Sequence, residues 1–203
     1  MMKAWKQLGI CILAVVMVWT GALLADRQTL RQELVRLHVV AASDSSEDQA
    51  IKLQVKDAVV SSLKADLEKL RSAEEALAYL QAQLPQIELL ANQILQESGS
   101  GDVAGVSLQM EEFPTRYYDT CALPAGIYQA LRITIGAGEG KNWWCVAFPG
   151  LCLPATTSGF EDAASCAGLS DGLTATLEEK PGYEIRFWLL DALGCVENFL
   201  HLK

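Results

Sequence analysis

The sequence VAGVSLQME at residues 103–111 separates a helical part of the chain from a β part, because the hydrophobic period changes here from that of a helix to that of a strand. Apolar residues occupy every second position from 106 to 110, which predicts a strand with one face on a core and one face in water. Two further strands are predicted at 131–135 and 143–148. Residues of about 103–153 are therefore expected to form a small, mostly antiparallel sheet.

The preceding residues, about 46–98, carry apolar side chains at helical spacing and predict two or three helices. Ser46 with Gln49 resembles a capping box, in which the serine oxygen accepts a hydrogen bond from a backbone N–H of the first turn. Ser72 with Glu75 resembles a second capping box. Ser46 is thus expected to be a structural cap.

A short strand is predicted before these helices by residues 34–41, LVRLHVVA. We expect Ser43 and Asp44 to cap the backbone where this strand meets the first helix. Residues 154–182, rich in small and polar side chains, predict a loose surface insertion, and residues 184–190 predict a last strand before a short terminal helix. This order of elements predicts an α+β fold.

The first 27 residues predict a signal peptide or an N-terminal membrane anchor. Lys3 and Lys6 precede 18 uncharged residues, Leu8–Ala25. As a helix these residues span about 27 Å, which matches the hydrocarbon core of a bilayer. The two lysines favour a cytoplasmic N-terminus, so residues 28–203 are expected to form a single exported domain.

Composition excludes several classes of function. The formal net charge is −9, and it becomes −11 without the two lysines of the leader, so we expect no nucleic-acid binding. Only two histidines occur, which excludes a metal site built from several histidines. The glycine-rich residues 136–142 lack the spacing of a P-loop or a dinucleotide fingerprint and predict a hairpin loop instead. We therefore expect no cofactor and no metal ion.

Five of the six cysteines lie in the exported part, where disulfides form. Because five is odd, at least one thiol is free or pairs with another chain. We predict a disulfide between Cys145 and Cys152. The alternative is an exported cysteine-dependent hydrolase, in which Cys145 is the nucleophile and His38 is the base.

Trp143 and Trp144 are consecutive residues of a predicted strand, so their side chains are expected on opposite faces. In one interpretation both tryptophans belong to the core. In the other, one is partly exposed and forms a partner-binding patch with Phe113 and Pro114, because tryptophan is enriched at interface hot spots.

Several short motifs resemble those of one known family. They are LVRLH at 34–38, FPT at 113–115, LPAG at 123–126, NWWC at 142–145 and FPxLC at 148–152. Over roughly residues 30–153 the chain resembles the stage II sporulation protein R family, whose members are signalling proteins of endospore-forming bacteria. The last two motifs are the most specific part of this resemblance.

The resemblance implies a ligand and not an enzyme, with no catalytic residues. It implies export across the forespore membrane into the intermembrane space, where the protein triggers a membrane-embedded aspartic protease of the mother cell, stage II sporulation protein GA. That protease activates the pro-form of sigma-E. We hypothesise a receptor-facing surface of seven residues: Phe113, Pro114, Arg116, Lys141, Asn142, Trp143 and Trp144.

Overall fold

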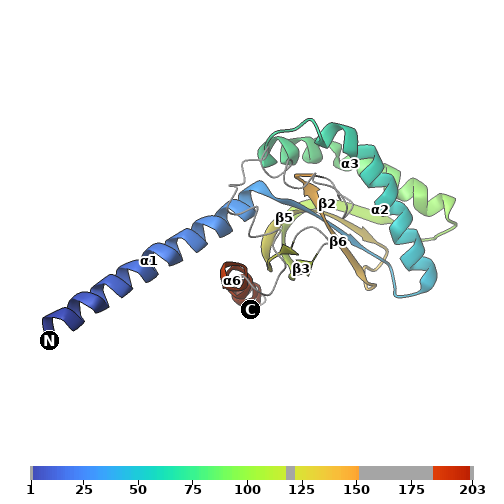
Figure 1. Ribbon diagram of the computed structural model, residues 1–203. Coiled ribbons are helices and arrows are strands. Elements are labelled where there is room, and N and C mark those ends of the chain that lie inside the picture. Colours follow the sequence, from blue (N-terminus) through green and yellow to red (C-terminus); the bar gives the residue numbers. More distant parts are fainter. Residues whose placement is uncertain (1, 118–121, 151–184, 202–203) are drawn as a thin grey trace.

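The computed structural model describes residues 2–117, 122–150 and 185–201. A long helix, α1 (Met2–Glu33), projects from a body in which two helices cover one face of a four-stranded sheet (Figure 1). The predicted α+β fold with an N-terminal apolar helix is confirmed. The loose insertion expected at 154–182 lies outside the described residues.

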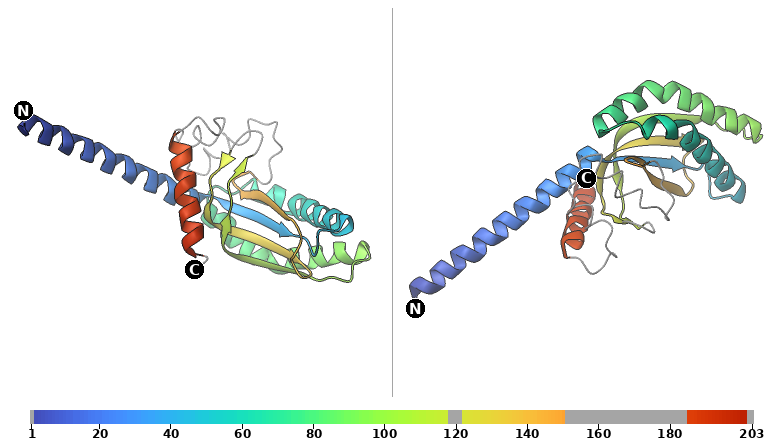
Figure 2. Two further views of the ribbon diagram at one scale, coloured as in Figure 1. Left: turned by 90° about the horizontal axis from the view of Figure 1, so that it is seen from below. Right: turned by 45° about the horizontal axis from the view of Figure 1, so that its top comes forward.

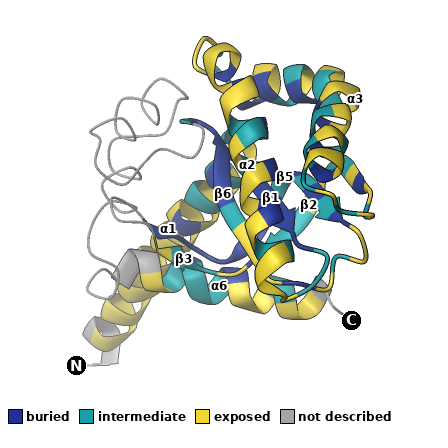
Figure 3. Cartoon of the chain, turned by 90° about the vertical axis from the view of Figure 1, so that its right-hand side faces the viewer, coloured by how far each residue is buried: buried dark blue, intermediate teal, exposed yellow. Residues whose placement is uncertain are grey.

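The strand order across the sheet is β2 (Ala104–Phe113), β5 (Gly126–Ile135), β1 (Val35–Val40) and β6 (Asn142–Phe148). The two outer pairs are antiparallel, as expected, whereas the central strands β5 and β1 are parallel. The first strand in sequence thus lies between two later ones. Every residue of β1 is buried, which fits its central position (Figure 3).

The helices α2 (Ser46–Leu67) and α3 (Ala73–Glu97) pack on each other and on the sheet, and each buries one stripe of apolar side chains. Ser72 caps α3 as predicted, because its side chain accepts a hydrogen bond from the backbone N–H of Glu75. Pro85 lies inside α3 without ending the helix.

The cap of α2 differs from the prediction. Ser45, not Ser46, accepts the hydrogen bond from the backbone N–H of Asp48, at 3.0 Å. Ser45 has the extended backbone conformation that a capping residue needs, whereas Ser46 is already the first residue of the helix. Ser43 accepts a hydrogen bond from the backbone N–H of Ser45, at 3.1 Å, and so acts as a local cap.

Asp44 has a longer-range role than the expected local cap. Its Oδ1 accepts a hydrogen bond from the backbone N–H of Lys141, at 2.7 Å, in the hairpin between β5 and β6. Next to it, the backbone N–H of Gly140 donates to the carbonyl of Ala41, at 3.0 Å. A Cβ atom at Gly140 would overlap the carbonyl oxygen of Ser43. The junction between β1 and α2 is therefore held against this hairpin.

The C-terminal helix α6 (Ile185–His201) replaces the last strand predicted at 184–190. That prediction is wrong because the apolar run of these residues fits either period, and the polar residues that follow recur at helical spacing. The helix lies beside α1 and against β5 (Figure 2). A short pair of strands, β3 (Arg116–Tyr117) and β4 (Ala122–Leu123), completes the described structure.

Candidate functional site

The register of the sheet separates its side chains into an apolar face and a polar face. Leu37 and Val39 of β1 are fully buried on the face that α2 and α3 cover (Figure 1). Arg36 and His38 project from the opposite face, because successive residues of a strand alternate. The register places four further side chains on this face: Glu111 of β2, Arg132 of β5, and Asn142 and Trp144 of β6.

Four of these side chains are joined by hydrogen bonds, and the fifth stacks on the imidazole. We call the five the His38 cluster: His38, Glu111, Arg132, Asn142 and Trp144. The imidazole Nδ1 lies 2.9 Å from Oε1 of Glu111, and Nε2 lies 2.8 Å from Oδ1 of Asn142. The ring stacks on the indole of Trp144, with 5.2 Å between ring centroids. A carboxylate only accepts hydrogen bonds, so Nδ1 of His38 carries a proton. The carboxamide of Asn142 has both a donor and an acceptor, so it can face either a neutral or a charged imidazole.

Glu111 is the anionic centre of the cluster. Its Oε1 also accepts a hydrogen bond from the guanidinium of Arg132, whose Nε donates to Thr134 Oγ1 at 3.0 Å. Burial raises the pKa of Glu111, but the hydrogen bonds and charges of His38 and Arg132 outweigh burial, so the pKa lies below its ordinary value. The carboxylate therefore stays ionised at neutral pH and fixes the imidazole.

A buried cation lies on the same face of the sheet as the cluster. Arg36 is fully buried, and its Nε donates to the backbone carbonyl of Cys145 at 3.1 Å. Its guanidinium lies 4.4 Å from the ring centroid of Phe113 and 5.3 Å from that of Tyr128, which are cation–π distances. Burial raises the pKa of Tyr128 to about 12, so its hydroxyl stays protonated and donates to the carbonyl of Pro124 at 2.8 Å.

The two tryptophans lie on opposite faces of the sheet, as predicted. Trp144 is half-buried in the His38 cluster, and the guanidinium of Arg116 lies 3.8 Å from its ring centroid. Trp143 is 38% exposed on the side of α2, with Nζ of Lys56 at 4.9 Å from its ring. The interpretation with both tryptophans in the core is therefore wrong. Lys141 lies in the exposed hairpin before Trp143.

The hypothesised receptor-facing surface is therefore not one continuous patch. Phe113 is 0% exposed and can only support its neighbours. Pro114 and Asn142 are exposed, and Arg116 and Trp144 are partly exposed. These last four residues are the part of the hypothesised surface that a partner can reach near the His38 cluster.

The proposed nucleophile and base of a cysteine hydrolase do not meet. Cys145 pairs with Leu37 across the β1–β6 ladder, whereas His38 pairs with Trp144, so Cys145 and His38 project from opposite faces. The predicted pairing of Cys145 with His38 is therefore wrong. Cys152 lies outside the described residues, so its disulfide with Cys145 stays a prediction. In the described ranges no group of three His, Cys, Asp or Glu side chains could hold a metal ion.

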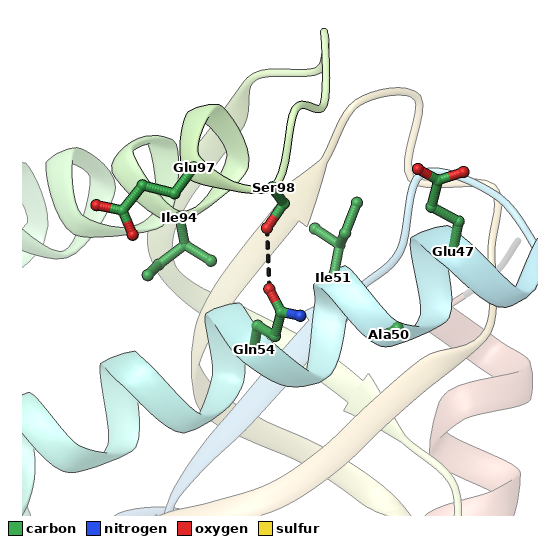
Figure 4. A pocket seen from close by; sticks show the side chains of 7 residues that line it. All are labelled: Glu47, Ala50, Ile51, Gln54, Ile94, Glu97 and Ser98. Carbon is green, nitrogen blue, oxygen red and sulfur yellow. Dashed lines mark hydrogen bonds between the residues drawn. The ribbon is translucent and has the colours of Figure 1, made fainter.

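A surface pocket of about 360 Å³ lies between α2 and the C-terminal end of α3 (Figure 4). A hydrogen bond from Ser98 Oγ to Gln54 Oε1, at 2.9 Å, crosses it. Glu47 and Glu97 are its only ionisable lining residues, and Figure 4 shows them at opposite ends, pointing apart. The pocket offers no pair of groups for acid–base or nucleophilic chemistry.

Sequence reasoning missed two members of the His38 cluster. Glu111 and Arg132 alternate with apolar residues, so the expected place for both was the solvated face of a strand. Charges of opposite sign at alternating positions on strands that pair could have indicated the cluster. Using that signal requires the strand order, which places β1 with His38 next to β5.

Comparison with known proteins identifies the family. The sequence profile of the family described as stage II sporulation protein R matches residues 31–158, which include the whole His38 cluster. Stage II sporulation protein R of Bacillus subtilis (strain 168) is 35% identical over 159 residues, covering 72% of this chain and 70% of that protein. No solved structure matches the chain. Since the match covers the whole four-stranded sheet and both covering helices, this chain belongs to the stage II sporulation protein R family and has a role in sporulation.

Proposed function

We propose that this chain is an exported signalling protein of endospore formation that activates a membrane-embedded aspartic protease, stage II sporulation protein GA. Activation of that protease leads to the processing of pro-sigma-E. The observation that carries the proposal is α1: Trp5–Glu33 is long and apolar enough to cross a membrane, and only 6% of its most apolar 18-residue stretch is buried in the body. Such a helix can place the body in the intermembrane space, either secreted or anchored to the forespore membrane.

A ligand role fits the polar face of the sheet better than catalysis does. The polar members of the His38 cluster bond to one another, and the sulfur of Cys145 projects from the opposite face. Preformed polar groups with an aromatic side chain among them are typical of protein recognition. We propose that Pro114, Arg116 and Trp144 contact the receptor protease.

Co-expression of the full chain with the receptor protease and pro-sigma-E in a host that does not sporulate tests this function. Processing of pro-sigma-E, followed on immunoblots, is expected only when all three proteins are present. A chain that lacks α1 and stays in the cytoplasm should give no processing. Processing without this chain, or equal processing by its cytoplasmic form, would disprove the proposal.

A matched pair of variants tests the contact surface. Trp144→Ala is expected to reduce processing strongly, and Trp143→Ala, on the opposite face, is expected to reduce it little. Both variants must be present at equal amounts outside the cytoplasm. The reverse order would move the contact to the face of Trp143 and Lys141, and two fully active variants would place it elsewhere on the molecule.

A further inference from the structure

The C-terminal helix α6 turns its polar side toward the body of the chain and its apolar side outward. Between residues 188 and 200 its charged and amide side chains are Asp191, Glu197 and Asn198. Asp191 Oδ1 accepts from the backbone N–H of Ala125 at 2.8 Å, and Asn198 Nδ2 donates to the carbonyl of Phe113 at 3.0 Å. Asp191 and Asn198 thus bond to the body of the chain.

Glu197 joins α6 to the helix that is proposed to cross the membrane. Its carboxylate forms ion pairs with Arg27 and Arg31 of α1, the second with 3.1 Å between Arg31 Nη1 and Glu197 Oε1. Both views in Figure 2 show α6 beside the base of α1, with its axis lying across that of α1. The helix is therefore on the side of the body from which α1 leaves.

The outward side of α6 is apolar. Trp188 is 65% exposed, Val196 is 57% exposed and Leu200 is 64% exposed. Residues spaced by four, seven, eight and eleven lie on one side of a helix, so the exposed side chains form one stripe, the α6 stripe: Trp188, Cys195, Val196, Phe199 and Leu200. No charged residue belongs to this stripe. An exposed apolar stripe on a helix whose polar side is bonded inward marks contact with a partner or a membrane.

The position of α6 along α1 favours a membrane, and not a protein partner, as the contact of the α6 stripe. Arg27 and Arg31 lie about 3 and 9 Å beyond Ala25, the end of the uncharged run, at the helical rise per residue. The headgroup layer of a bilayer is about 5–8 Å thick on each side of the hydrocarbon core. When the uncharged run of α1 fills that core, the ion pairs with Glu197 hold α6 at the level of the headgroups.

We infer that α6 is an interfacial helix, which lies in the headgroup layer with the α6 stripe in contact with acyl chains. Tryptophan is enriched at this depth, and the acidic body fits a zwitterionic surface rather than an anionic one. Together α1 and α6 fix the orientation of the body on the membrane and direct the opposite end of the sheet away from it. The inference rests on the proposed insertion of α1.

Quenching of tryptophan by brominated lipid tests the two helices separately. The full chain is reconstituted in phosphatidylcholine vesicles with ordinary or brominated acyl chains. Trp5 and Trp19 report on α1, and Trp5→Phe with Trp19→Phe leaves three tryptophans in the body. In this double variant we expect that bromine quenches part of the emission, and that adding Trp188→Phe removes most of the quenched part.

Trp143→Phe is the matched control, because Trp143 is exposed and pairs with Val39 near the end of β1 that is remote from α1. This change should leave the quenched part of the emission intact. Quenching that Trp188→Phe does not reduce would overturn the inference, and quenching of Trp5 and Trp19 alone would leave the proposed function standing. If neither helix is quenched, the proposed membrane insertion of α1 fails as well.

Val196→Glu provides a second readout, because it places a carboxylate in the α6 stripe without touching the core. It is expected to abolish the quenching of Trp188 while the urea midpoint of the body stays unchanged. If Val196→Glu instead dissociates an oligomer of the chain in detergent, a second copy covers the stripe, and the inference of a membrane contact is wrong.

Discussion

Replacing Glu111 with Gln removes the negative charge of the His38 cluster and keeps the size of the side chain. The Glu111 side chain is 11% exposed, and its Oε1 accepts hydrogen bonds from both His38 and Arg132. A hydrogen bond to a charged group contributes about 1.5–3 kcal/mol. Because Gln keeps one acceptor oxygen and solvent reaches part of Arg132, we expect Glu111→Gln to lower the free energy of unfolding by about 2 kcal/mol at neutral pH.

The pH dependence of this loss follows from the direction of the pKa shift. The pKa of Glu111 is lower in the folded chain than its ordinary value, since His38 and Arg132 outweigh burial. Such a carboxylate stabilises the fold fully above its unfolded pKa of about 4.3, and this contribution is lost as the pH falls through the folded pKa. The difference between the wild type and Glu111→Gln should therefore shrink below about pH 4.

Urea unfolding of the full chain in a non-ionic detergent, followed by tryptophan emission, measures both effects. Glu139→Gln is the control, because Glu139 is exposed in the hairpin between β5 and β6, and its change is expected within about 0.5 kcal/mol of the wild type. If Glu111→Gln costs no more than the control, or if its cost is the same in acid, the cluster does not stabilise the fold as described.

Three further predictions use the same unfolding assay or a thiol count. Asp44→Ala should lower the free energy of unfolding by about 1 kcal/mol, because it removes the acceptor of a backbone N–H in the hairpin. Unchanged stability would show that this hydrogen bond does not stabilise the fold. Gly140→Ala should cost about 1–3 kcal/mol, since its Cβ overlaps the carbonyl oxygen of Ser43; wild-type stability would show that the junction can relax. The predicted bridge requires that Cys145→Ser and Cys152→Ser each expose one additional reactive thiol in the unfolded, unreduced chain, and an unchanged count in either variant argues against it.

The local elements could be predicted because their signals lie within a few residues of sequence. The uncharged run of α1, the helical spacing of α2 and α3 and the alternation in β2 each reflect a period that burial imposes on neighbouring residues. Capping was predictable to within one residue: Ser72 is correct, whereas the cap of α2 is Ser45 and not Ser46. Adjacent serines are chemically equivalent, and backbone conformation decides between them.

The candidate site was predictable only in part, because it depends on pairing between distant strands. The sequence alone places Trp143 and Trp144 on opposite faces, and the motifs around them indicate the family. Only the tertiary structure inserts β1 between β5 and β6, which brings His38 beside Arg132 and next to Glu111. The pattern of residues in one sequence cannot reveal this strand order, because strand pairing depends on backbone hydrogen bonds that almost any residue can make.

Length, charge and hydrophobic period suffice to predict that an apolar helix precedes an acidic α+β body. They do not reveal which charges are buried together, which side of α6 faces outward or where α6 meets α1. These features follow from the packing of segments far apart in the chain, such as Glu197 with Arg27 and Arg31. Such contacts join residues that are close in space but distant in the chain, so they produce no periodic pattern in the sequence.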